Sequence, residues 1–126
     1  MFRWGYKDII PELPMVDCLF CRIVRREIPA QIVHEDEQAL VIKDITPQAP
    51  THLLVIPKRH LGSLSASTDG DAPLLGHLQR VACRLAESAK LSSFRLVMNN
   101  GKGAGQSVDH LHYHLLGGRP MTWPPG

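Results

Sequence analysis

The feature that most restricts the fold of this sequence is the alternation of three histidines with other residues in His110-Leu-His112-Tyr-His114. In an extended strand, side chains two residues apart point to the same face and lie roughly 7 Å apart. The alternation therefore predicts a strand from His110 to Leu116 with the imidazoles in a row on one face. Such a row has three interpretations: hydrogen-bonded structural histidines, a metal centre, or a catalytic group.

Short apolar runs bounded by turn residues predict four more strands. An acidic turn at 35–38 separates the first two, which is the pattern of a hairpin, and Pro57 closes the third. With the histidine segment, the predicted strands are residues 32–35, 39–43, 52–57, 94–98 and 110–116. Strands joined mostly by short turns favour a largely antiparallel sheet.

Two segments have apolar residues at helical spacing. Leu19 to Glu27 predicts a short amphipathic helix that is capped by Asp17 and ended by Pro29. Residues 74–89 repeat apolar side chains at intervals of three and four, which predicts a helix of about 17 residues. The expected fold class is α+β: a five-stranded, mainly antiparallel sheet with one long and one short helix.

Size and composition restrict the organisation and the partners. The 126 residues, 44% of them hydrophobic, are enough for one domain with its own core. We expect that domain at 17–126, after a loosely ordered extension at 1–16 in which Met15 is an alternative start to Met1. A net charge of +2 provides no strong basic field for nucleic acid. Without a long apolar stretch or a secretion signal, the expected location is cytoplasmic, with no membrane partner.

A glycine-rich segment, 101–105, leads into the histidine row. Its backbone N–H groups are unobstructed by side chains, and Lys102, Gln106 and the Ser107 hydroxyl are further donors, which suits an anionic phosphate. Such a segment is as often a plain turn, and a dinucleotide-binding loop is excluded because no helix follows it. A phosphate cradle beside imidazoles predicts phosphoryl or nucleotidyl transfer, since imidazole attacks phosphorus without a metal and water then hydrolyses the phosphoimidazole.

Further motifs accompany the histidine row. They are 44–52 (DITPQAPTH), 55–60 (VIPKRH), 74–78 (LLGHL), 105–108 (GQSV) and 116–126 (LGGRPMTWPPG). With them, the chain resembles the Hint branch of the histidine triad (HIT) family, from about Asp17 to its last residue. The resemblance implies a HIT-like fold whose sheet continues across a homodimer. It also implies an adenosine 5'-monophosphoramidase-like nucleotide hydrolase that acts on purine nucleoside phosphoramidates and needs no cofactor for catalysis.

The resemblance implies a role for each residue of the catalytic group. His112 is the nucleophile that becomes nucleotidylated. His110 and His114 orient the site, with His114 hydrogen-bonding near the phosphate. His52 holds the second nitrogen of His112 or its neighbours, and Ser107 donates to the departing amine.

The same resemblance implies a nucleotide pocket. Asp44 takes the ribose hydroxyls, although by itself it is equally a turn residue. The base is walled by residues that periodicity alone assigns to ordinary core, namely Leu19, Phe20, Ile23, Ile42 and Ile45. The phosphate is bordered by Asn99, Gly105 and Val108, next to the loop donor Gln106.

The implied dimer forms through the long helix and the strand at 94–98, which would otherwise leave a bare sheet edge. Trp123 then reaches the active site of the second subunit. The alternative for this exposed tryptophan and the prolines after it is a flexible tail.

A second site involves cysteines. Cys18-Leu-Phe-Cys21 has the spacing of two thiolates on one zinc ion, and a closed site needs two more ligands. His60 and His110 are the candidates, as in bacterial-type members of the superfamily. Zinc would be structural there, because four protein ligands leave no open position for water. Reduced thiols without metal, or redox chemistry, are the alternatives.

The chain also departs from the family pattern. Asp109 stands where an aromatic residue is common, and its charge beside the row is expected to raise the pKa of His110 or His112 unless it points away. Lys102 and Ala104 also vary the loop. Other functions stay open: a purine-nucleotide-binding or interaction module with incidental hydrolysis, a dinucleoside polyphosphate hydrolase, and a metal-dependent hydrolase.

Overall fold

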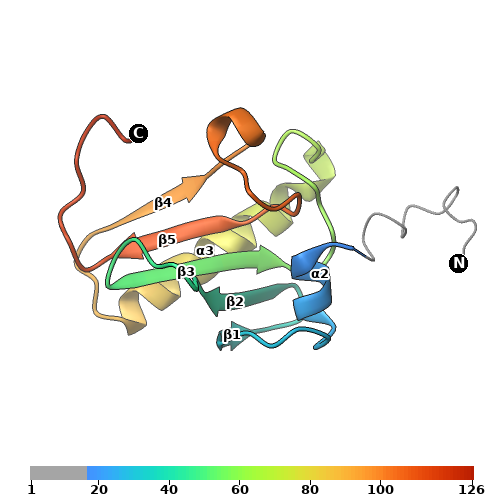
Figure 1. Cartoon of the computed structure of the whole chain (residues 1–126), viewed down its shortest axis with the longest axis horizontal. Helices are drawn as coiled ribbons and strands as arrows, with labels where there is room; N and C mark the ends of the chain where they lie inside the picture. The colour runs from blue at the N-terminus through green and yellow to red at the C-terminus, as the bar shows by residue number, and fades with distance from the viewer. Residues whose placement is uncertain (1–16) are drawn as a thin grey trace, which may run out of the picture.

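The computed structural model describes residues 17–126; the predicted extension at 1–16 lies outside them. The elements are α2 (Leu19–Val24), β1 (Ile32–Glu35), β2 (Ala39–Lys43), β3 (Thr51–Pro57), α3 (Ala72–Ser88), β4 (Phe94–Met98) and β5 (Tyr113–Gly117), with short 3₁₀ turns η1 (Asp69–Asp71) and η2 (Lys102–Ala104). The strands form one sheet in the order β1-β2-β3-β5-β4, and every neighbouring pair is antiparallel (Figure 1). The predicted α+β class and the five-stranded antiparallel sheet are confirmed.

The two helices cover opposite faces of the sheet (Figure 1). Successive side chains of a strand point to opposite faces, so each strand contributes to both layers. The α3 face of the sheet consists of Ala39, Val41, Leu53, Val55, Tyr113 and Leu115. The α2 face consists of Leu40, Ile42, Leu54 and Ile56 under Phe20 and Ile23. By the same alternation, His52 and His114 lie on the α2 face.

The long helix supplies most of the core on its side. Its buried residues, Leu74, Leu78, Val81, Ala82 and Ala86, follow the spacing of three and four that predicted the helix. α3 has 17 residues and begins two residues earlier than expected, because a proline in its first turn is already set for helical geometry. Among residues 17–126, no helix is long and apolar enough to cross a membrane.

The short helix begins at Leu19 as predicted, but its cap and its end differ from the prediction. α2 has six residues and ends at Val24, because Arg25 caps it and Arg26 adopts a left-handed backbone with φ 64°. Asp17 is not the cap. Cys18 holds that position with an extended backbone, and its Sγ accepts the backbone N–H of Cys21 at 3.4 Å.

The histidine strand is also shorter than predicted. β5 begins at Tyr113, so only His114 of the three histidines lies in the strand. Tyr113 is opposite Met98, the last residue of β4, and the chain before it leaves the ladder because that neighbour ends there. The preceding segment is held instead by the Leu111 N–H, which donates to the Leu61 carbonyl at 2.6 Å. The other four strands match their predicted ranges, except that β3 begins one residue earlier.

Candidate functional site

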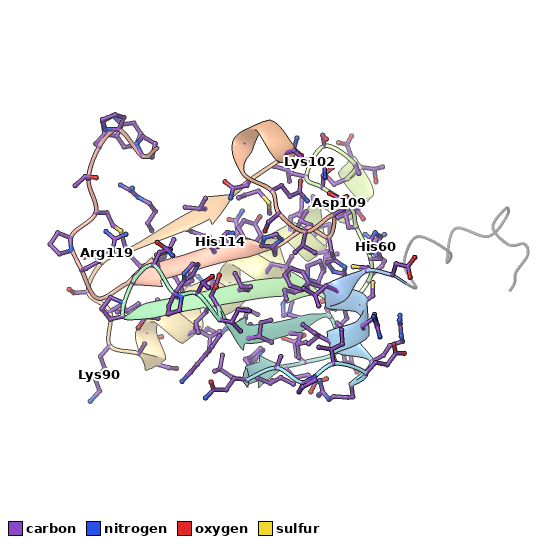
Figure 2. The ribbon with its side chains drawn as sticks, viewed as in Figure 1. His60, Lys90, Lys102, Asp109, His114 and Arg119 are labelled. Atoms are coloured by element: carbon purple, nitrogen blue, oxygen red, sulfur yellow. The ribbon has the colours of Figure 1, made fainter. Side chains whose placement is uncertain are left out.

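The predicted row of three imidazoles is divided between two neighbouring sites. His112 and His114 remain adjacent, with ring centroids 5.0 Å apart. His110 turns toward His60 and the cysteines, with its ring 4.9 Å from that of His60. In Figure 2, His114 lies over the sheet and His60 lies near the start of α2. Residues 110–112 are therefore not in a strand, but the rings of His112 and His114 still lie next to each other.

His112 has a defined proton position. Its Nδ1–H donates to the backbone carbonyl of His110 at 2.8 Å, which leaves an unshared electron pair on Nε2. Burial lowers the pKa of His112, and this outweighs the carbonyl of His110 and the charge of Asp44, which raise it. The ring is therefore neutral near pH 7, with Nε2 as a nucleophilic nitrogen.

His114 is oriented through a chain of hydrogen bonds that begins on the backbone. The Gln48 N–H donates to His52 Nδ1 at 3.0 Å, so the proton of neutral His52 is on Nε2. That Nε2–H donates to His114 Nδ1 at 2.9 Å, which puts the proton of His114 on its own Nε2. Burial, together with His112 and His52, lowers the pKa of His114 to about 4. His114 is thus a neutral hydrogen-bond donor whose ring lies next to that of His112.

Asp44, His52 and His114 are close enough to suggest a metal site, since one ligand atom from each lies within 4.8 Å of the others. The hydrogen bond from Gln48 argues against it. A metal needs the unshared pair of His52 Nε2, and that atom carries the proton. His52 and His114 therefore belong to the hydrogen-bonded chain that begins at Gln48, and the Asp44 carboxylate lies beside it, with Oδ2 3.4 Å from His52 Nε2.

A pocket of about 700 Å³ opens between α2 and the α2 face of the sheet. His112 and His114 line it together with all five predicted base-contacting residues, Leu19, Phe20, Ile23, Ile42 and Ile45. The size and the mostly apolar lining with a few polar groups are typical of a small-molecule site. Ile45 is 96% exposed and forms the outer rim.

Asp44 is a turn residue that also lines the pocket. Its Oδ1 accepts the backbone N–H of Thr46 at 2.8 Å, which makes it a turn residue. Its Oδ2 lies 3.4 Å from His52 Nε2, and the residue also lines the pocket. The turn thus fixes a carboxylate at the edge of the pocket.

The glycine-rich loop enters the site only in part. Ser107 and Val108 line the pocket, whereas Asn99, Gly105 and Gln106 do not. Gln106 is buried, and its side chain accepts the Gly101 N–H at 2.8 Å and donates to the carbonyls of Gly62 and Val108. Because both ends of its amide have partners within the protein, Gln106 braces the loop and is not a free donor. Gly101 and Gly105 have positive φ of 90° and 96°, the backbone geometry for which glycine is favoured.

The second site gathers Cys18, Cys21, His60 and His110, with one ligand atom from each within 4.8 Å of the others. We call it the thiol–imidazole cluster. Cys21 Sγ is 3.2 Å from His60 Nδ1, and Cys18 Sγ is 3.3 Å from His110 Nδ1. His110 Nε2–H donates to the Pro57 carbonyl at 2.8 Å, so its Nδ1 presents an unshared pair to the thiols.

This donor set fits a zinc ion. Two sulfurs and two imidazole nitrogens are a common tetrahedral ligand set, and the Pro57 carbonyl orients one imidazole as outer partners of zinc ligands do. Burial lowers the pKa of His110 to about 4, which keeps the ring in its neutral, ligating form. Burial and Cys18 raise the pKa of Cys21 to about 12, so its thiol keeps its proton unless a cation is present.

Asp109 does not act on the histidine row as expected. The pKa values of His110 and His112 are both lowered, and burial is the main cause of each shift. The charge of Asp109 acts on His60, where it only partly offsets the lowering by burial. Asp109 is exposed on the loop that follows η2 (Figure 2).

Sequence reasoning missed the groups that set the proton positions. They are the backbone N–H of Gln48 and the carbonyls of Pro57 and His110. Every residue carries a backbone carbonyl and every residue except proline a backbone N–H, so no sequence signal marks these groups. Trp123 is 82% exposed and does not line the pocket of its own chain.

Comparisons with known proteins agree with this geometry. Residues 17–122 match the family model described as scavenger mRNA decapping enzyme C-term binding. A HIT-like protein from Synechocystis is 55% identical over 111 residues, which cover 87% of this chain and 97% of that protein. The crystal structure of a HIT family hydrolase from Legionella pneumophila has 52% identity and a TM-score of 0.86, covering 87% of this chain and 100% of the other. A histidine triad protein from Clostridium difficile has 39% identity and a TM-score of 0.81, covering 84% and 94%. The chain therefore belongs to the histidine triad family.

Proposed function

We propose that this protein hydrolyses purine nucleoside 5'-phosphoramidates through a nucleotidyl intermediate on His112. One observation carries the proposal: His112 has its Nδ1–H engaged by a carbonyl, and the residue lines a pocket of about 700 Å³ beside His114. Its free Nε2 is then the nitrogen available to a bound phosphorus. The similarity to a HIT family hydrolase from Legionella pneumophila supports hydrolysis as the reaction class.

In the first step, the unshared pair of His112 Nε2 forms a bond to phosphorus, and the phosphorus–nitrogen bond breaks as the nitrogen takes up a proton from solvent and leaves as the amine. The His110 carbonyl stabilises the positive charge that develops on the ring, because it already accepts the Nδ1–H. The Nε2–H of His114 donates to a phosphoryl oxygen, and Ser107, on the pocket wall, donates to the departing nitrogen.

In the second step, water attacks phosphorus and the bond to His112 Nε2 breaks. The nucleoside monophosphate gains the hydroxyl of water, and the remaining proton of water replaces the one that the departing amine took up in the first step. His112 returns to its starting protonation state. Dividing the reaction into two displacements lowers each barrier, and the intermediate needs no metal.

The nucleotide is held by the rest of the pocket. The apolar walls from α2 and β2 enclose the base, and the Asp44 carboxylate accepts hydrogen bonds from the ribose hydroxyls. Asp44 is already fixed by Thr46, so it loses little side-chain entropy on binding.

We also propose that two chains associate along β4. This strand is an edge of the sheet among residues 17–126, and its Phe94 is 40% exposed. Pairing of β4 with its copy would satisfy the free backbone groups of both edges. Trp123 would then contact the partner's site; light scattering on the intact protein tests the dimer.

The decisive experiment for the reaction compares wild type with His112→Ala. With an adenosine phosphoramidate, we expect the variant to lose turnover by about 10⁴-fold or more, because the nucleophile is gone. AMP binding should stay within about threefold of wild type, since the walls are intact. Rapid quench of wild type should trap a nucleotide bound to His112.

His77→Asn is the matched control, because His77 bonds to Asp36 outside the pocket. It should retain wild-type turnover. Tight AMP binding with no turnover and no trapped adduct would favour the binding module. Faster cleavage of a dinucleoside polyphosphate would favour that substrate class, and complete loss of the adduct in chelator would favour a metal-dependent hydrolase.

A further inference from the structure

His110 takes part in both sites at once. Its side chain belongs to the thiol–imidazole cluster, with Nδ1 at 3.3 Å from Cys18 Sγ and 3.5 Å from Cys21 Sγ. Its backbone carbonyl accepts the Nδ1–H of His112 at 2.8 Å. Any movement of the His110 peptide therefore changes the hydrogen bond that fixes the proton of the nucleophile.

Phe20 makes a second connection. It lies in α2 between Cys18 and Cys21, so the two cysteines fix the residue from both sides. Its ring packs edge-on against His112, with centroids 5.1 Å apart, and against His110 at 5.8 Å. The same side chain lines the nucleotide pocket.

The elements that carry these connections have little support of their own. α2 has six residues, and an isolated helix of that length is not stable in water. His112 precedes the first residue of β5, so it lies outside the paired ladder of the sheet. The position of His112 thus depends on how firmly His110 and α2 are held.

We propose that Cys18, Cys21, His60 and His110 are positioning residues for the nucleophile. When they close around a divalent, thiol-binding metal ion, they fix the His110 peptide and Phe20, and so hold His112 with its proton on Nδ1. The inference rests on the proposed function of His112 and on the fit of the cluster to zinc. It adds a catalytic consequence to a site whose donor set by itself indicates only structural support.

A loosened cluster has a specific consequence. The His110 ring would lose its contacts to the two thiols and keep those to the Pro57 carbonyl and to Phe20. Its peptide would still be held by the hydrogen bond from the Leu111 N–H to Leu61, but with the ring less firmly fixed the His110 carbonyl would gain freedom. His112 would then populate both neutral tautomers, and in one of them Nε2 carries the proton and cannot attack. The expected kinetic result is a lower kcat with little change in nucleotide affinity, because most of the pocket wall is unaffected.

The test uses the full-length protein in three forms: zinc-loaded wild type, metal-depleted wild type, and Cys18→Ser. Serine is a good helix cap, so this substitution removes a ligand while the start of α2 is kept. Cys83→Ser is the matched control, because Cys83 lies in α3, outside the cluster. Each form is measured for bound zinc, for melting temperature, for kcat and KM with an adenosine phosphoramidate, and for the ¹⁵N shifts of His112.

We expect stoichiometric zinc and one His112 tautomer, protonated on Nδ1, in loaded wild type and in Cys83→Ser. Metal depletion and Cys18→Ser should lower kcat by about tenfold, with KM within about threefold, as for other losses of outer support to a site. Their His112 shifts should average toward a mixture of tautomers, and zinc should restore only the depleted wild type.

Three results would overturn the proposal: no zinc binding, a lower melting temperature with kcat and the tautomer unchanged, or an equal loss in Cys83→Ser. If Cys18→Ser does not fold, the depleted wild type decides. If zinc-loaded wild type shows no turnover, the proposed function fails, whereas the ¹⁵N shifts still decide whether the cluster fixes His112.

Discussion

The two faces of the sheet are covered to different extents. The fully covered α3 face stabilises the fold, and the partly covered α2 face holds the candidate site. On the α3 face, a 17-residue helix packs over a continuous apolar layer. On the α2 face, a six-residue helix covers only part of the sheet and leaves the pocket of about 700 Å³. β5 contributes to both, because Tyr113 and Leu115 point to one face and His114 to the other. A complete core on one face allows polar groups to be exposed to ligand on the other.

The largest effect on stability is expected on the α3 face. Leu78 is fully buried under α3, so Leu78→Ala removes apolar contacts and leaves a cavity. We expect the free energy of unfolding to fall by about 3 kcal/mol, measured by urea denaturation. The turnover per folded molecule should not change, because Leu78 contacts neither site. Arg80→Ala, on the exposed side of the same helix, is the control and should cost less than about 0.5 kcal/mol.

A smaller loss is expected at the polar edge of this face. Asp36 Oδ2 accepts from both His34 Nε2 and His77 Nε2 at 2.9 Å, and Oδ1 accepts the N–H groups of Gln38 and Ala39 at 2.8 Å. Burial raises the pKa of Asp36, but these hydrogen bonds outweigh it and hold the pKa well below its usual value. Asp36→Asn should lower the free energy of unfolding by about 2 kcal/mol, since charge-assisted bonds are lost.

The control for this variant is Glu37→Gln, in the same turn. It should leave the urea midpoint within about 0.5 kcal/mol of wild type. Equal midpoints for wild type and Asp36→Asn would show that the bonds between β1, the turn and α3 do not stabilise the fold.

Acid should lower the free energy of unfolding through the buried histidines of the α2 face. Burial lowers the pKa of His112 and, with neighbouring histidines, lowers that of His114 to about 4. In the unfolded chain both titrate near 6.5, so below about pH 6.5 the unfolded state binds more protons than the folded state, and for His114 this range extends to about pH 4. The free energy of unfolding therefore falls on acidification, by up to about 1.4 kcal/mol per pH unit for each histidine.

Urea midpoints from pH 7.5 to 5.0 measure this slope, above the range in which Asp36 titrates. His114→Gln should flatten it, because one of the titrating groups is gone. Leu78→Ala should shift the whole curve and keep its slope. An unchanged slope in His114→Gln would mean that His114 is protonated to the same extent in both states.

The sequence predicted which segments form helices and strands better than it predicted the residues at which they begin and end. Short apolar runs, the alternating histidine segment and two helical periodicities located the five strands and two helices of residues 17–126, because each pattern reports burial against a layer. The end of α2 at Val24 could not be read, since it depends on a left-handed Arg26, a conformation that sequence does not mark for arginine. The start of β5 depends on where its neighbour β4 ends, which is a tertiary fact.

The site was predictable as far as side chains define it. All five predicted base-contacting residues line one pocket, and the four predicted metal ligands lie together. The sequence could not show that Gln106 is not a free donor. Its partners are backbone groups of Gly62 and Gly101, which no sequence signal marks, and Gly62 is also far away along the chain. The partnership of His34 and His77 through Asp36 was missed, because Asp36 and His77 are 41 residues apart.

The smallest effect separates binding from folding on the α2 face itself. Ile45 is 96% exposed and lines the pocket rim, so Ile45→Ala should leave the free energy of unfolding within about 0.5 kcal/mol. If the base packs against it, the variant loses about 1 kcal/mol of binding, or roughly fivefold in the Kd for AMP measured by calorimetry.

Ile32→Ala is the matched control, since Ile32 is an exposed isoleucine of β1 outside the pocket. Its Kd for AMP should equal that of wild type. An equal Kd in Ile45→Ala would place the base deeper, against Phe20 and Ile23 alone. A side chain that contributes to binding and almost nothing to stability is what a partly covered face predicts, because its apolar surface is buried only when the ligand completes the cover.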